Sequence, residues 1–215
     1  MSKLRIKYYD YFSIIYDRFV ALHSSDRSGN LREYLSEKTQ TAKQDRILDI
    51  CTGTGSLLQH LSKRVGKNGI VVGVDFSRGM LVVAGRKTNR LNQVYLIQAN
   101  VGHLPFKKHV FDAVTCAYAF YELKGEIQDK CLREIGRVLK KRKPFLLMEH
   151  DIPKNPVIRA FFYVRMASMG PQQALQILRH EIDLLSRHFK CVEKVRTPTG
   201  RSKIIICKGQ SSHSV

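Results

Sequence analysis

The sequence of 215 residues lacks any apolar run that approaches the roughly 20 residues of a membrane-spanning helix. The apolar run AFFYV at Ala160–Val164 is at most an interfacial patch. The first residues contain no short apolar core with a small-residue cleavage site, so we expect no signal peptide. These absences favour a cytoplasmic protein and leave peripheral attachment to a membrane as an open alternative.

Paired cysteines are also missing. The chain has five cysteines, an odd number, and none of them forms a C-x-x-C pair or a Cys/His cluster. We therefore expect no metal site and no disulfide scaffold. Cysteines scattered in this way are typical of small buried apolar side chains in a reducing compartment.

Acidic residues are few relative to basic ones. Lysine and arginine number 37 against 18 aspartate and glutamate, which gives a formal net charge of +19. The excess is spread along the chain, with local runs at Lys140–Lys143 and after Arg159. A dispersed positive charge attracts polyanions, and both anionic lipid surfaces and nucleic acids qualify. A role in solubility alone is equally compatible with this composition.

Strand-like and helix-like segments alternate from Arg46 onward. Continuous apolar runs bounded by glycine are typical of strands buried on both faces. Five such strands are expected in the segments RILDI, GIVVGVD, QVYLIQA, FDAVTCAYA and KPFLLMEH, with helices between them. This alternation predicts a doubly wound α/β sheet with parallel strands.

The last part of the chain departs from that alternation. Two strand-like runs, KCVEKVR and KIIICKG, are separated only by TPTGRS, which is too short for a crossover helix. They should form a hairpin, so the sequence predicts a seven-stranded, mostly parallel sheet that ends in an antiparallel hairpin strand. Nothing indicates repeats or a second domain, and we expect residues 1–210 to form one domain followed by a disordered tail at 211–215.

The loop in ILDICTGTGS, at residues 47–56, lies between the first strand and the first crossover helix. In open α/β sheets, ligands bind at the carboxyl ends of the strands, where glycines let the backbone approach them. A P-loop is excluded because no Gly-Lys-Ser/Thr follows the glycines. Asp75, about 20 residues on, suits a ribose, but G-x-G-x-x-G requires glycine where Leu58 stands. The loop alone therefore leaves the cofactor undecided.

The wider pattern consists of Asp49, two glycines, VDFSRGML, QANVGHLPF and the closing hairpin. In this order the motifs resemble class I S-adenosylmethionine-dependent methyltransferases, closest to the ubiquinone/menaquinone C-methyltransferase branch. The resemblance covers roughly residues 8–150 and implies a Rossmann-like methyltransferase fold with S-adenosylmethionine as cofactor and S-adenosylhomocysteine as product. It also implies that residues 1–45 are a helical lid, 46–150 a cofactor-binding core, and 151–210 a substrate-covering segment plus the hairpin.

By position, the resemblance implies a set of cofactor contacts. Asp75 would bind both ribose hydroxyls, Phe76 and Met80 would flank the adenine, and Ala117 and Tyr118 would meet the methionine end. The remaining residues of the implied cofactor site are Asp49, Cys51, Gly53, Gly55, Asn100 and Val101. Cys51 replaces the first glycine of the family's loop, a change we expect to be tolerated with a negative φ and a less constrained loop.

Methyl transfer from a sulfonium needs chiefly a dry pocket that holds donor and acceptor at reacting distance. Candidates for contact with the acceptor, or for proton transfer, are Tyr16 in the implied lid, Tyr118 and Tyr121 after the fourth strand, and His150 after the fifth. No Asn/Asp-Pro-Pro-Tyr/Phe tetrapeptide follows the fourth strand, which argues against the amino-type DNA and protein-glutamine methyltransferases.

The segment at residues 152–171 mixes aromatic and aliphatic side chains with arginines, which suits an amphiphile or an anionic lipid interface. We therefore expect a small or lipophilic acceptor, such as a quinone precursor or a phospholipid headgroup. An anionic membrane is the expected partner surface and nucleic acid a less favoured one, while the oligomeric state stays open. The alternative is a non-catalytic or RNA-directed S-adenosylmethionine-binding module with a basic surface.

Overall fold

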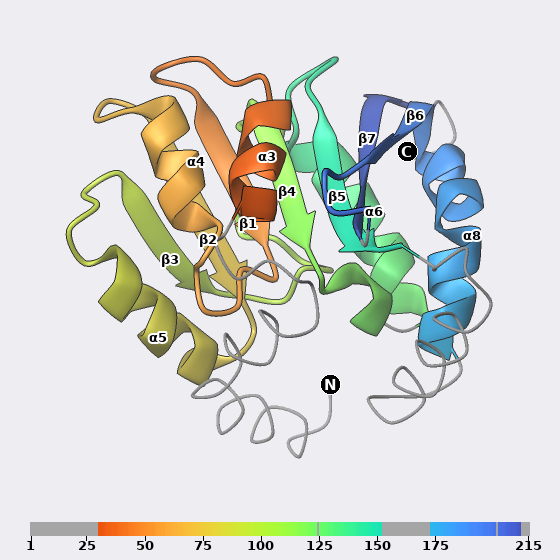
Figure 1. The fold of residues 1–215 in the computed structure, drawn as a ribbon, viewed down its shortest axis with the longest axis horizontal. Coiled ribbons are helices and arrows are strands. Elements are labelled where there is room, and N and C mark those ends of the chain that lie inside the picture. Colours follow the sequence, from red (N-terminus) through yellow and green to blue (C-terminus); the bar gives the residue numbers. More distant parts are fainter. Residues whose placement is uncertain (1–29, 124, 152–172, 201, 212–215) are drawn as a thin grey trace.

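The computed structural model describes residues 30–123, 125–151, 173–200 and 202–211, and all structural statements refer to these residues. Seven strands form one sheet in the order β3-β2-β1-β4-β5-β7-β6 (Figure 1). The strands are β1 (Arg46–Ile50), β2 (Ile70–Asp75), β3 (Val94–Gln98), β4 (Ala113–Ala117), β5 (Phe145–His150), β6 (Phe189–Arg196) and β7 (Ser202–Gln210). The helices are α3 (Asn30–Lys38), α4 (Leu58–Val65), α5 (Arg78–Thr88), η1 (Phe120–Glu122), α6 (Glu126–Val138) and α8 (Gln173–His188).

The direction of the strands confirms the predicted topology. β1 pairs in parallel with β2 and with β4, β2 with β3, and β4 with β5. β7 runs antiparallel to both β5 and β6, because the short turn after β6 brings the chain straight back along it. The doubly wound, mostly parallel sheet with an antiparallel C-terminal hairpin strand is therefore confirmed.

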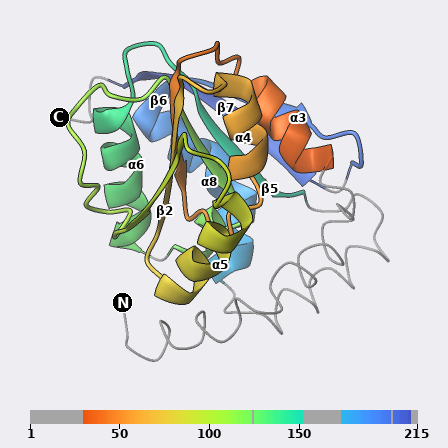
Figure 2. The same ribbon diagram turned by 90° about the vertical axis from the view of Figure 1, so that its left-hand side faces the viewer.

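Helices cover both faces of the sheet (Figure 2). Leu31, Leu35 and Leu61 bring α3 and α4 onto one face, where they pack against β-strand side chains such as Ile47. Ile135 of α6 and other α6 and α8 side chains pack on the opposite face, in a second cluster of buried residues. Side chains of a parallel strand alternate between the two faces, so every central strand contributes to both clusters.

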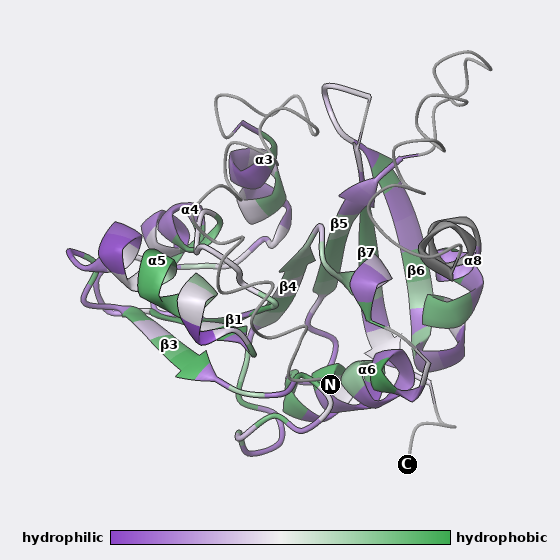
Figure 3. Ribbon diagram, turned by 90° about the horizontal axis from the view of Figure 1, so that it is seen from below, coloured by the Kyte–Doolittle hydropathy of each residue, from purple (hydrophilic) through white to green (hydrophobic). Residues whose placement is uncertain are grey.

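The central strands are largely apolar, as the sequence predicts for strands covered on both faces (Figure 3). All six residues of β5 are buried, including Glu149 and His150 at its carboxyl end. Polar side chains buried at a strand end need partners. The carboxyl end of β5 is therefore a candidate position for a functional site.

Several sequence predictions concern residues outside the described part of the chain. They include Tyr16, residues 1–29 of the implied lid, the segment 152–171 and most of the expected tail. Of that tail, Ser211 is described, and its N–H donates to the carbonyl of His188 at the start of the hairpin. None of the helices in the described residues is both long and apolar enough to span a bilayer.

Candidate active site

The loop after β1 is built on three left-handed residues. Cys51, Gly53 and Gly55 have φ of 52°, 55° and 74°. At Gly55 an added Cβ would lie 2.8 Å from the Cβ of Ala84, so glycine lets α5 approach the loop closely. The expectation of a negative φ at Cys51 was wrong, because the loop turns away from β1 at this residue and needs the same left-handed geometry that its two glycines supply. A non-glycine residue in this region carries a steric cost.

Asp75, at the end of β2, is tied to that loop. Its Oδ2 accepts a hydrogen bond from the Gly53 N–H at 2.8 Å, and its Oδ1 accepts one from the Ser77 N–H at 2.9 Å. A carboxylate offers about four acceptor directions and is the kind of group that binds ribose hydroxyls. The side chain is 5% exposed and thus sits at the base of the loop.

Asp49 lies under the same loop on β1 and is buried. Its two carboxylate oxygens accept from the hydroxyls of Thr52 at 2.6 Å and Thr115 at 2.7 Å. Burial raises its pKa to about 6, although these two hydrogen bonds and the positive charge of Arg32 act in the opposite direction. A cation placed next to Asp49 would therefore stabilise its charged form.

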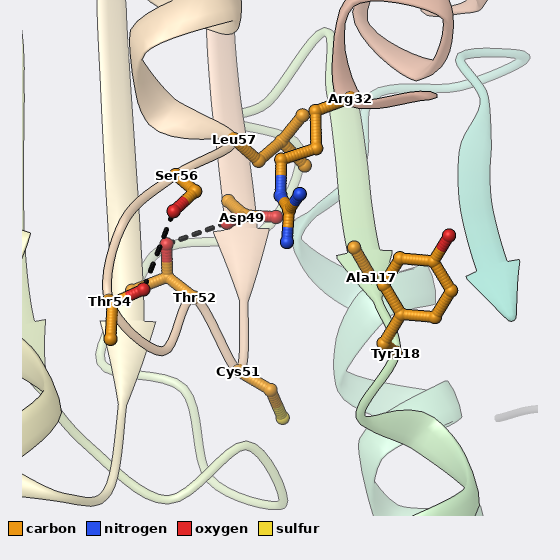
Figure 4. A pocket seen from close by; sticks show the side chains of 9 residues that line it. All are labelled: Arg32, Asp49, Cys51, Thr52, Thr54, Ser56, Leu57, Ala117 and Tyr118. Atoms are coloured by element: carbon orange, nitrogen blue, oxygen red, sulfur yellow. Dashed lines mark hydrogen bonds between the residues drawn. The ribbon is translucent and has the colours of Figure 1, made fainter. Parts of the chain in front are cut away.

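A pocket opens between the loop and the end of β4 (Figure 4). Four of the predicted site residues line it: Asp49, Cys51, Ala117 and Tyr118. Thr52, Thr54, Ser56, Leu57 and Arg32 complete the lining.

Arg32 was not predicted from the sequence. Its guanidinium extends from α3 toward Asp49 and the pocket (Figure 4). It comes from a helix outside the strand–helix alternation, and a single arginine in a basic chain carries no sequence signal. Only the packing of α3 against the sheet, through Leu31 and Leu35, brings it to the loop.

The four residues assigned to the adenine lie beyond the ends of β2 and β3. Phe76 is half-buried, while Met80 is 3% exposed and belongs to neither large core cluster. Asn100 is exposed and its Oδ1 accepts from the Gly102 N–H at 2.9 Å, which forms a turn beside the buried Val101. None of them lines the pocket near Asp49, so they form a separate group along the same edge of the sheet.

The aromatic candidates after β4 and β5 come together. The Tyr118 ring lies 4.8 Å from the His150 ring between centroids, and the Tyr121 ring lies 6.2 Å from it. The Tyr118 hydroxyl is 2.8 Å from the Ser202 hydroxyl on β7, and the residue has φ of 56°. Tyr118 thus lines the pocket and also belongs to this aromatic group. Tyr16, the fourth candidate, lies outside the described residues.

No metal centre accompanies these groups in the described part of the chain, where no three His, Cys, Asp or Glu side chains are placed to hold an ion. The site consists of a left-handed loop, two carboxylates at strand ends, an arginine and an aromatic group. At the carboxyl edge of a parallel sheet, this arrangement is typical of a cofactor-binding α/β protein.

Comparison with known proteins identifies the class. A family model described as a methyltransferase domain matches residues 47–142. A protein named demethylmenaquinone methyltransferase from Lactiplantibacillus plantarum is 32% identical over 191 residues, covering 85% of this chain and 79% of the relative. One of the same name from Staphylococcus saprophyticus is 32% identical over 144 residues, covering 67% of this chain and 61% of the relative. The chain belongs to the class I S-adenosylmethionine-dependent methyltransferases, near the quinone methyltransferase branch, and the cofactor of this family is S-adenosylmethionine.

Solved structures agree on the fold. An S-adenosylmethionine-dependent methyltransferase from Aquifex aeolicus has a TM-score of 0.63 at 22% identity, covering 82% of this chain and 88% of that one. A methyltransferase-like protein from Methanococcus maripaludis has a TM-score of 0.67 at 15% identity, covering 96% and 95%. The chain spans only 61% and 59% of the lengths of the Staphylococcus saprophyticus relative and of a Lactobacillus johnsonii relative.

Proposed function

We propose that this chain transfers a methyl group from S-adenosylmethionine to a small, lipophilic acceptor of the quinone-precursor type. The observation that carries the proposal is the position of Tyr118. It lines the pocket beside the glycine loop, and its ring also lies against the His150 ring at the end of β5. The cofactor and the acceptor would therefore meet at Tyr118. Relatives named demethylmenaquinone methyltransferase support a quinone-related acceptor. A phospholipid headgroup, the second acceptor expected from the sequence, gains no support from these relatives.

The residues present fit the polar groups of S-adenosylmethionine, which are two ribose hydroxyls, a carboxylate and an ammonium. Asp75 is assigned to the ribose hydroxyls, since its buried carboxylate lies at the base of the loop and accepts hydrogen bonds. Arg32 is assigned to the carboxylate and Asp49 to the ammonium, because the two side chains bring opposite charges to one small pocket.

The adenine is assigned to the second group of residues. Phe76 and the buried Met80 offer apolar surface next to the end of β2. The Asn100 carbonyl oxygen has two lone pairs, so it can accept from the adenine amino group while keeping its bond to the Gly102 N–H. The Val101 backbone, beside it, completes the group.

When bound, the cofactor supplies a methyl group already activated on a sulfonium. The chain's own task is then to hold the acceptor in line with that methyl and to exclude water. The bond between Tyr118 and Ser202 fixes the Tyr118 ring as one wall of the site. His150, which faces both Tyr118 and Tyr121, is the group assigned to take a proton at its ring nitrogen where the acceptor must lose one.

Calorimetry with S-adenosylhomocysteine and with NAD tests the cofactor assignment. We expect binding of the former and none of the latter. Asp75→Ala should weaken S-adenosylhomocysteine binding by about 1.5–3 kcal/mol, roughly ten- to a hundredfold, because charge-assisted hydrogen bonds to the ribose are lost. Asp45→Ala is the matched control, since this carboxylate caps the turn at Ala42 before β1. Unchanged affinity in Asp75→Ala would place the cofactor elsewhere.

Turnover tests the acceptor. The protein, S-adenosylmethionine and a reduced demethylated quinone should yield S-adenosylhomocysteine and a methylated ring, detected by mass spectrometry. Binding of the cofactor without turnover of any quinone precursor would contradict the proposed acceptor. It would favour the binding-module alternative, which an RNA-dependent methylation or RNA-binding assay then addresses.

A further inference from the structure

Cys51, in the loop after β1, lies beside Cys116 on the neighbouring strand β4. Cys116 is the fourth residue of β4, and its Cα pairs in register with that of Ile50, the last residue of β1. Cys51 follows Ile50 directly. The Cys51 Cα is therefore offset by one residue along the strand direction from the Cα that pairs with Cys116. For strands about 4.8 Å apart, this offset puts the Cα atoms of Cys51 and Cys116 at roughly 5.8 Å. Disulfides bridge Cα atoms about 4.4–6.8 Å apart, so the backbone spacing suits one.

The left-handed turn brings the Cys51 side chain to the correct face. Alternation along β1 places Leu48 and Ile50 in the core cluster under α6, and would send the next side chain to the opposite face. Because Cys51 has φ of 52°, the alternation breaks there. Cys51 then packs against the same cluster as Cys116.

The two thiols are in direct contact. A hydrogen bond between them, followed by burial, raises the pKa of Cys116 well above its usual range. This contact places the two sulfurs within reach of each other, as a disulfide between them requires.

The two cysteines differ in access. Cys51 is half-buried and lines the pocket, whereas Cys116 is fully buried. A small reagent that enters the pocket meets Cys51 in the lining, which does not include Cys116. This combination of an accessible sulfur and a buried thiol in contact with it is typical of a nucleophilic and a resolving cysteine.

We propose that Cys51 and Cys116 are a redox modification site, at which a hydroperoxide entering the cofactor pocket converts the two thiols to a reversible disulfide. The Cys51 thiol releases its proton, and its sulfur attacks one peroxide oxygen and becomes a sulfenic acid as the O–O bond breaks. The leaving oxygen takes up a proton and departs as an alcohol or water. The Cys116 sulfur then attacks the Cys51 sulfur, and the Cys116 proton joins the departing hydroxide as water. One disulfide forms, one peroxide is reduced, and a dithiol restores both thiols by exchange.

The modification would act on cofactor binding through the loop. A disulfide shortens the sulfur–sulfur contact to about 2.05 Å, which draws Cys51 toward β4. Gly53 is two residues further along the loop, and its N–H is bonded to Asp75. Displacing the loop should therefore loosen the contact between the loop and the carboxylate that is assigned to the ribose.

The test uses the full chain, treated with hydrogen peroxide, alkylated and digested without reductant. We expect a cross-linked pair of peptides containing Cys51 and Cys116, which disappears after treatment with dithiothreitol. Cys116→Ser should abolish the cross-link and leave Cys51 to overoxidise. Cys191→Ser is the control, because this exposed cysteine lies on β6 and its loss should leave the cross-link unchanged.

Three results would overturn the site: no cross-link, a cross-link of Cys51 to Cys131, or sulfinic acid at Cys51 in the wild-type chain without a cross-link. Peptide mapping needs no methyl donor or acceptor, so it stands apart from the proposed function. A second measurement compares S-adenosylhomocysteine affinity before and after oxidation, with at least a ~tenfold loss expected that reductant restores. Unchanged affinity in the cross-linked protein would overturn the effect on the loop. Absent affinity in the reduced protein would instead contradict the cofactor site.

Discussion

At the scale of single residues, Cys51 holds a backbone geometry that favours glycine. The left-handed region costs a non-glycine residue about 1–2 kcal/mol in the folded state, while glycine loses about 0.5–1 kcal/mol more conformational entropy on folding. Cys51→Gly should therefore change the free energy of unfolding by less than about 1 kcal/mol, in the stabilising direction, and preserve or improve cofactor affinity. Urea unfolding and calorimetry with S-adenosylhomocysteine measure both quantities.

Cys51→Val provides the comparison, since a β-branched side chain is disfavoured at positive φ. It should be less stable than the wild type. Complete loss of cofactor binding in Cys51→Gly would mean that the thiol itself contacts the ligand, which the loop geometry does not require.

Asp49 predicts a pH dependence of cofactor binding. Its pKa is raised to about 6 by burial, so near neutral pH it is charged and below about 6 it is protonated. If it holds the cofactor ammonium, affinity for S-adenosylhomocysteine should fall as pH drops through about 6, with a slope approaching tenfold per pH unit. Calorimetry between about pH 5 and pH 8 measures the profile.

Asp49→Asn is the matched variant, because its amide cannot titrate and can still accept a hydrogen bond from Thr52 or Thr115. Its affinity for S-adenosylhomocysteine should be lower than that of the wild type at neutral pH and should not change with pH across this range. A profile that keeps the same step in Asp49→Asn would assign the titration to another group, such as His150.

At the scale of elements, the junction of β5, β7 and α8 buries three charged side chains: Glu149, Lys203 and Glu181. Lys203 forms an ion pair with Glu181. Glu149 Oε1 accepts from the Phe120 N–H at 2.9 Å and so anchors η1, the turn that carries Tyr121. The position of an aromatic site residue thus depends on a buried carboxyl group of the neighbouring strand β5.

Glu149 predicts a pH-dependent stability difference. Burial, and then the charge of Glu181, raise its pKa well above 4.5, so the folded state binds its proton more tightly than the unfolded state. The stability that this proton supplies is fully present below about pH 4.5 and is lost as pH rises through the folded pKa. Glu149→Gln is neutral throughout. Its free energy of unfolding relative to wild type should increase by up to about 1.4 kcal/mol per pH unit between about pH 4.5 and the folded pKa of Glu149, and should level off above that pKa.

Asp112 supplies a control, because its pKa is shifted in the opposite direction and its effect on stability has the opposite pH dependence. Burial alone would raise its pKa, but hydrogen bonds from Lys140 and from the Arg46 N–H lower it below 3.8. Its contribution is present above that pH and is lost as pH falls through the lower folded value. Asp112→Asn should therefore be less stable than wild type at neutral pH, and the deficit should vanish in acid. Parallel denaturation curves for both variants at several pH values check the two signs, and a constant difference for Glu149→Gln would refute the buried-proton account.

At the scale of the whole molecule, positive charge gathers at the amino ends of β4 and β5. Hydrogen bonds from Val110 N–H to Val138 and from Lys140 N–H to Phe111 bring the segments 107–111 and 138–143 side by side. We call Lys107, Lys108, Lys141 and Arg142 the basic corner, and all four are exposed. Asp112, the acid within it, is already paired with Lys140 and Lys143.

This corner predicts salt-dependent attraction to anionic surfaces. The chain, at +19, should sediment with phosphatidylserine vesicles at low salt and dissociate as ionic strength rises. The double variant Lys107→Glu/Lys108→Glu should weaken binding more than the matched control Lys190→Glu/Lys208→Glu, which removes the same charge from β6 and β7. Equal losses would mean that net charge alone acts. No binding at low salt would remove the membrane as a partner.

The sequence predicted the core of this protein well, because its signals there are local and repetitive. Each central strand is an apolar run bounded by turn residues, and Leu61 and Val65 recur at helical spacing in α4. Serine favours helix N-termini, and the Ser77 hydroxyl accepts from the Met80 N–H at the start of α5. The short TPTGRS turn made the antiparallel strand inevitable, since no crossover helix fits in it.

What only the tertiary structure decided involves contacts between distant parts of the chain. Arg32 reaches the pocket because α3 packs on the sheet, and no periodicity in its own helix shows that. The sign of φ at Cys51 follows from the turn that brings Gly53 into a hydrogen bond with Asp75, which lies 22 residues from Gly53 in sequence. Local patterns thus determined the strands and their order along the chain, and the resemblance of the motifs to a known family indicated the class. The pairing of thiols, charges and rings was fixed only when packing brought separate strand ends to one edge, because side-chain contact depends on distance in space and not on distance along the chain.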